Sequence, residues 1–100
     1  MNLNEEVPKM LADMTETFIA RNSTYGDNYI LLGKVMTALF PEGITLKTED
    51  DFIRYHWIDW TMGKLTRWIR AGMNHDDSIK DAAVYLAMLA AWSKAHERQE

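Results

Sequence analysis

Two basic and two acidic side chains form the most suggestive chemical pattern in the sequence. Lys64 and Arg67 are three residues apart and Asp77 and Asp81 are four apart, so each pair shares one face of a helix. Arginine offers a planar fork of donors that fits phosphate oxygens, and lysine offers a compact charge. One or two carboxylates can hold Mg²⁺ that keeps water and phosphates as its other ligands. The pattern predicts a phosphate site in which the acids orient the bases or bind Mg²⁺.

The same four residues also fit a structural role. Partly buried charges in helical proteins are commonly paired, so the two bases and two acids would form salt bridges that orient two neighbouring helices. The turn expected near Met73 lies between the pairs. If the chain folds back there, both pairs lie at similar heights, at about 1.5 Å per residue. The two roles are compatible, and both stay open at this point.

A second group of ligand-type residues lies in a predicted loop, residues 21–28, of sequence RNSTYGDN. Arg21 and Tyr25 beside the start of a helix offer a donor and a stacking ring to an anionic ligand. The alternative is an ordinary loop in which Gly26 has a positive φ and Asp27 caps the next helix.

Aromatic residues extend the predicted binding set. Trp60 lies on the same helical face as Lys64, one turn before it, and is a candidate for packing on a nucleotide base. Tyr85 continues the row formed by Asp77 and Asp81. The other three tryptophans are expected in the core, because tryptophan is highly buried on average.

Composition excludes several classes of function. Fifteen acidic and eleven basic residues give a net charge of -4, which argues against a protein that coats nucleic acid. The absence of cysteine removes disulfides and thiolate chemistry and fits a reducing cytosol. The three histidines lack metal-site spacing, and no glycine-rich phosphate loop occurs. With no signal-peptide layout and no apolar run of about 20 residues, we expect a cytoplasmic protein without a membrane span.

The elements that must position these residues are all helical. One domain spanning residues 1–100 is predicted, with helices over about 4–21, 28–40, 48–70 and 76–98. The fold class is all-α, a four-helix bundle-like domain with a long C-terminal antiparallel helix hairpin. Asn4 is expected to cap the first helix, and Thr48 with Asp51 to cap the third. The first helix carries an apolar stripe that we expect to pack inward: Val7, Met10, Leu11, Met14 and Phe18.

The third helix has apolar residues on more than one side. Such a helix is usually buried on several sides, which is difficult for a single chain of this size. We therefore expect a homo-oligomer, most simply a two-fold dimer.

Three short motifs carry a resemblance to a known family. RNSTYGDN at 21–28, GKLTR at 63–67 and DSIKDAAVY at 77–85, with a connector containing Gly43-Ile44-Thr45, resemble in order and spacing a family of small phage and prophage proteins of unassigned function. That family is related to the all-α, MazG-like NTP pyrophosphohydrolases. The resemblance covers about residues 10 to 90.

The resemblance implies a helical bundle that dimerises or tetramerises and binds nucleotides. In the superfamily, acidic helix motifs bind Mg²⁺ and cleave a nucleoside triphosphate between its α and β phosphates. By resemblance, Asp77 and Asp81 stand at the metal-binding acids of the second motif. Lys64 and Arg67 stand where the first acidic pair is expected, which removes half of the metal cage and supplies phosphate donors.

The sequence thus predicts a protein that binds a nucleotide or another phosphate-bearing small molecule, with Lys64, Arg67 and Arg21 on the phosphates. It is either a divergent Mg²⁺-dependent NTP pyrophosphohydrolase or a non-catalytic nucleotide-sequestering protein that counteracts host signalling. If phage-encoded, it would work in the host cytoplasm. A helical protein-interaction module without a small-molecule site is the third alternative.

Overall fold

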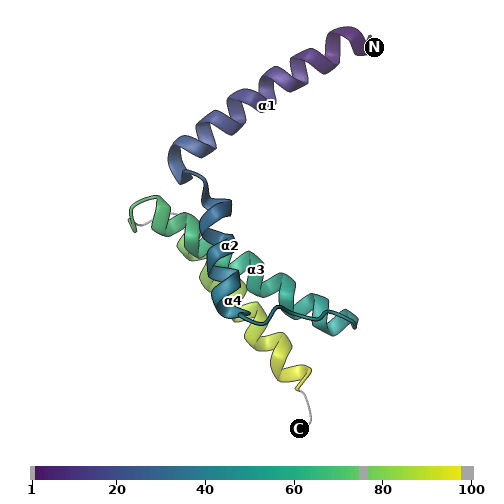
Figure 1. The fold of residues 1–100 in the computed structure, drawn as a ribbon, viewed down its shortest axis with the longest axis vertical. Coiled ribbons are helices and arrows are strands. Elements are labelled where there is room, and N and C mark those ends of the chain that lie inside the picture. The colour runs from purple at the N-terminus through teal and green to yellow at the C-terminus, as the bar shows by residue number, and fades with distance from the viewer. Residues whose placement is uncertain (1, 75–76, 98–100) are drawn as a thin grey trace.

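The computed structural model describes residues 2–74 and 77–97, apart from the side chains of residues 24 and 25, and all regular secondary structure in this part of the chain is α-helical. Figure 1 shows α1 (Leu3–Tyr25), α2 (Asn28–Leu39), α3 (Glu49–Arg70) and α4 (Asp77–Ala95). The described residues contain no strand. The predicted all-α class with four helices is therefore confirmed.

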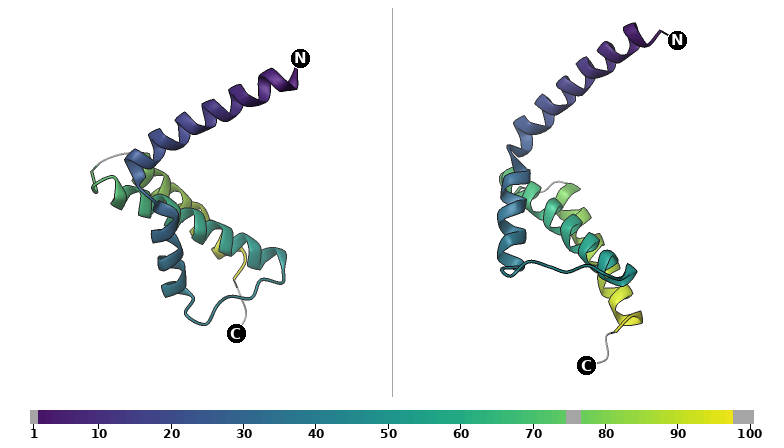
Figure 2. Two further views of the ribbon diagram at one scale, coloured as in Figure 1. Left: turned by 45° about the horizontal axis from the view of Figure 1, so that its top comes forward. Right: turned by 45° about the vertical axis from the view of Figure 1, so that its right-hand side comes forward.

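Helices α3 and α4 form the base of the molecule. They lie side by side and run in opposite directions, as both views in Figure 2 show. The residues buried deepest along them are small: Thr61, Thr66, Ser78 and Ala82. Small side chains let two helices approach closely, but they bury little apolar area.

The start of α3 is fixed by a complete capping box. The Thr48 hydroxyl accepts a hydrogen bond from the Asp51 backbone N–H at 3.1 Å, and the Asp51 carboxylate accepts one from the Thr48 N–H at 3.2 Å. Aspartate is one methylene shorter than the usual glutamate at this position. The sequence predicted the start of this helix.

Helix α2 crosses α3 at Gly63. The Asn28 side-chain amide, at the first turn of α2, donates to the Gly63 carbonyl oxygen at 3.5 Å, and the Thr66 hydroxyl donates to the same oxygen at 3.0 Å. A Cβ atom added to Gly63 would lie 3.9 Å from the Leu32 side chain. The glycine thus marks the point where α2 approaches α3.

Helix α1 corrects the expectation of a compact bundle. The C-terminal end of α1 meets α3, and the rest of α1 projects away from the other three helices (Figure 1). The radius of gyration is 17.7 Å, whereas a compact chain of 100 residues has about 13 Å. The stripe expected to pack inward, from Val7 to Phe18, is exposed instead, because none of the described helices packs along its length.

Both ends of α1 also differ from the prediction. The N-cap is Asn2, whose side chain accepts from the Asn4 N–H at 2.9 Å, so Asn4 lies inside the helix. Residues 21–25, predicted as loop, are helical, and the Ser23 hydroxyl donates to the Ile19 carbonyl at 2.8 Å. The helix ends at Gly26, which has φ +45° as expected for a terminating glycine. Asp27 follows as the N-cap of α2 without a side-chain capping bond.

Among the described residues, no helix has the combined length and apolar character needed to cross a membrane.

Candidate functional site

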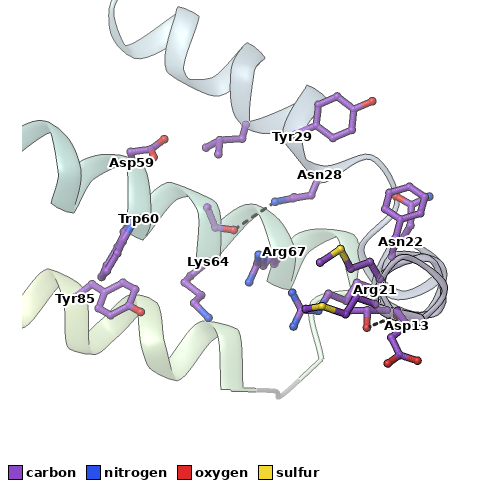
Figure 3. Close-up of a pocket in the computed structure, with 16 residues that line it drawn as sticks. Asp13, Arg21, Asn22, Asn28, Tyr29, Asp59, Trp60, Lys64, Arg67 and Tyr85 are labelled. Atoms are coloured by element: carbon purple, nitrogen blue, oxygen red, sulfur yellow. Dashed lines mark hydrogen bonds between the residues drawn. The ribbon is translucent and has the colours of Figure 1, made fainter. Parts of the chain in front are cut away.

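An open cleft of about 880 Å³ lies between α1, α2 and α3, with one residue contributed by α4 (Figure 3). Its walls belong to three helices because α1 diverges from α2 and α3 at the Gly26 turn. Five of the predicted binding residues line it: Arg21, Trp60, Lys64, Arg67 and Tyr85. The fold therefore brings side chains as far apart in the sequence as Arg21 and Tyr85 to one cavity.

Three basic side chains lie in the same part of the cleft. Lys64 and Arg67 come from successive turns of α3, and Arg21 comes from the last turns of α1 (Figure 3). Lys64 is about a quarter exposed, and its Nζ lies 3.0 Å from Asp81 Oδ2 on α4. The contact holds the Lys64 ammonium group beside α4, at the edge of the cleft.

The two predicted metal-binding acids differ in their surroundings. Asp81 is paired with Lys64, whereas Asp77 is exposed at the start of α4 and does not line the cleft. Within the part of the chain that is described, no group of three or more His, Asp or Glu side chains could hold a metal ion. A Mg²⁺ site at Asp77 and Asp81 stays a prediction.

An aromatic cluster forms one end of the cleft. The rings of Trp60 and Tyr85 are 5.5 Å apart, and those of Trp60 and His56 are 4.0 Å apart. Trp57 meets Trp60 edge-on at 5.9 Å. Trp60 is nevertheless 46% exposed, so part of its ring system is accessible from the cleft. A ring fixed by neighbours yet partly accessible offers a planar, apolar surface to a base.

Some lining residues were missed by the sequence analysis. Asp13 and Asp59, which were not among the predicted site residues, both line the cleft, although the Asp13 carboxylate points away from the three basic side chains in Figure 3. A signal for Asp13 existed, because it lies eight residues, or about two turns, before Arg21 on one helical face. Asn28 also lines the cleft, and its side-chain oxygen is buried without a hydrogen-bond partner.

The predicted contribution of Tyr25 cannot be placed in the same way. Tyr25 closes α1, but its side chain lies outside the described residues. Its neighbour Asn22 does line the cleft and accepts a hydrogen bond from the Asp27 N–H at 3.1 Å. The Tyr-Gly-Asp motif is therefore linked to the cleft lining through the hydrogen bond between Asp27 and Asn22.

The arrangement can hold an elongated anion with an attached ring. Cationic donors lie on one side and an accessible indole on the other (Figure 3). The Asp59 carboxylate, which also lines the cleft, is an acceptor for hydroxyl or amino groups. Comparison with family models, with characterised proteins and with solved structures finds no match. The MazG-like resemblance stays a prediction.

Proposed function

We propose that this protein binds a nucleotide, or a nucleotide-derived small molecule, in the cleft between α1, α2 and α3. The observation that carries the proposal is the joint presence of Arg21, Lys64 and Arg67 beside the Trp60–Tyr85 ring pair in one cavity. Small-molecule sites usually measure about 300–1,000 Å³ and combine apolar walls with a few convergent polar groups. The cleft, at about 880 Å³, has that size and lining.

Each lining group has a distinct part in the proposed complex. The guanidinium groups of Arg21 and Arg67 and the ammonium group of Lys64 bind phosphate oxygens through charge-assisted hydrogen bonds. Trp60 packs on the base, and Tyr85 supports the indole from α4. Asp81 holds Lys64 in place until the anion binds.

Binding without turnover is the version that the geometry favours. A Mg²⁺ ion, if bound, would polarise a phosphoryl oxygen and lower the pKa of its water. Asp81 is engaged by Lys64 and Asp77 lies outside the cleft lining, so these two acids do not form a ready cation site. A binder of this kind acts by lowering the free concentration of its ligand. The proposed assembly is a homo-oligomer in which each chain contributes an antiparallel hairpin of α3 and α4.

The test is titration calorimetry with a panel of ribonucleoside and deoxyribonucleoside triphosphates, in EDTA and then in Mg²⁺. We expect binding in EDTA that is weakened by Lys64→Gln and by Arg67→Gln. Arg70→Gln is the matched control, because Arg70 is one turn further along α3, is exposed and does not line the cleft. Pyrophosphate release in Mg²⁺ would show the hydrolase instead. If no nucleotide binds in either condition, the site proposal fails and the interaction module is left.

A further inference from the structure

The single chain exposes far more surface than a compact protein of its mass. Its accessible surface is 7922 Å², whereas a folded monomer of 11.6 kDa has about 5,800 Å². The excess is about 2,000 Å² per chain. Standard protein interfaces remove about 800 Å² from each partner, and permanent ones remove more. The excess therefore has the size of a permanent interface.

Much of the exposed apolar surface lies on one face of α1, which we call the inner face. It comprises Leu3, Val7, Met10, Met14 and Phe18. These residues fall within about 40° of a single line along the helix, at 3.6 residues per turn. Each is between 45% and 63% exposed. No charged residue interrupts this line until Arg21, so the surface can meet a copy of itself without like charges opposing each other.

The inner face and the cleft are one continuous surface. Its C-terminal part, Met10, Met14 and Phe18, lines the cleft together with Arg21. Its N-terminal part, Leu3 and Val7, lies outside the cleft lining, in the half of α1 that projects away from the other helices (Figure 2). A partner that buries the whole face must therefore also lie over the mouth of the cleft.

We infer that a second copy of this chain covers the inner face of α1 and closes the cleft, so that a two-fold dimer contains two equivalent closed sites. A two-fold axis places the same patch of both chains in contact, so one interface can bury the excess exposed surface of each chain. The cleft of each chain is complete only when the other chain lies over Met10 and Met14. The effect of closure on ligand binding rests on the proposed nucleotide site, but the interface itself does not.

The first test is sedimentation equilibrium of the full chain. We expect twice the chain mass of 11.6 kDa for the wild type and the single-chain mass for Met14→Glu, which places a charge at the centre of the inner face. Ala12→Glu is the matched control, because Ala12 is exposed on the opposite side of α1, and it should remain dimeric. A monomeric wild type at all concentrations, or a dimer unaffected by Met14→Glu, would overturn the inference.

A second measurement keeps the test valid if Met14→Glu does not fold. The chain has no cysteine, so Met10→Cys and Ala12→Cys each carry one thiol for a polarity-sensitive dye such as acrylodan. The dye at position 10 should emit at shorter wavelength in the dimer and shift to longer wavelength on dilution. The dye at position 12 should not respond. Because Met10 lines the cleft, an unchanged emission at position 10 would show that the cleft is not closed by association.

Closure also predicts a change in nucleotide affinity. Val7→Glu, on the part of the inner face outside the cleft lining, should also give the single-chain mass. It keeps all three bases and adds no charge to the cleft, yet it should weaken ATP binding by roughly tenfold or more, because an open cleft stays hydrated and water weakens each charge contact. Full ATP affinity in a folded, monomeric Val7→Glu would refute the closed site. A wild type that dimerises but never binds ATP would support the interface, while it would remove the proposed function.

Discussion

The contact between Lys64 and Asp81 allows the binding role and the structural role of these charges to be separated. Its Nζ–Oδ2 distance is 3.0 Å, and the two side chains are 25% and 42% exposed. Pairs with this degree of exposure contribute only about 0.2–1 kcal/mol, because solvent screens them. Asp81→Asn should therefore reduce the free energy of unfolding by about 1 kcal/mol at most, which shifts Tm by about 4–8 °C or less in a domain of this size.

The same change should strengthen nucleotide binding in EDTA. An incoming phosphate must displace Asp81 from Lys64, so in Asp81→Asn the free energy of that ion pair no longer opposes binding. This free energy of about 0.2–1 kcal/mol corresponds to a gain of roughly 1.5- to 5-fold in affinity. Lys64→Gln should act in the opposite direction. It removes a hydrogen bond to a charged group, worth about 1.5–3 kcal/mol, and so should weaken ATP binding by roughly 10- to 150-fold.

The assay is calorimetric titration of ATP into the wild type, both single variants and the double variant, with thermal unfolding followed by circular dichroism. Protein concentration must be the same throughout, because association makes Tm concentration-dependent. In the double variant, Asp81→Asn should no longer increase affinity. A loss of ATP affinity in Asp81→Asn, or unchanged affinity in Lys64→Gln with both variants strongly destabilised, would refute the reasoning and show that the pair is structural.

Three further outcomes test the capping, packing and stacking arguments. Thr48→Ala should lower the free energy of unfolding by about 1 kcal/mol, measured by urea denaturation, because it removes the oxygen that caps α3. Gly63→Ala should leave the free energy of unfolding unchanged or raise it by up to about 1 kcal/mol in the same measurement. The added Cβ meets Leu32 at an ordinary 3.9 Å, and alanine favours a helix. A clear loss of stability would show that α2 lies closer to α3. Trp60→Leu should weaken ATP binding by about 1–3 kcal/mol through lost stacking, while inorganic tripolyphosphate, which has no base, should bind as it does to the wild type.

The helical content of the fold was predictable from local signals. The capping residues Thr48 and Asp51 and the terminating glycine at 26 act within one helical turn, so their effect can be read without tertiary information. The end of α1 was predicted too early because Asn, Ser and Asp are common in loops. Ser23 instead donates to a carbonyl of its own helix, an option that composition alone does not distinguish from a loop.

The direction of α1 was not predictable from the sequence. The stripe from Val7 to Phe18 shows that one face of this helix favours burial, but amphipathicity does not specify the surface that buries it. The cleft residues show the same limit. Asp59 and Trp60 are adjacent in the sequence, and their shared role at the cleft depends on the crossing of α2 over α3 at Gly63.

The position of Arg21 makes the phosphate part of the site the least dependent on assembly. Arg21 lies on the last turns of α1, close to where this helix meets α3, so a change in the angle of α1 moves it little. Met10 lies about three turns further out, so the same change moves it much more. A monomer should therefore still bind tripolyphosphate through Arg21, Lys64 and Arg67, while losing affinity for ligands that extend along the inner face. Equal losses for both ligands in a folded, monomeric Val7→Glu variant, whose new charge lies outside the cleft lining, would show instead that the partner chain also shapes the phosphate site.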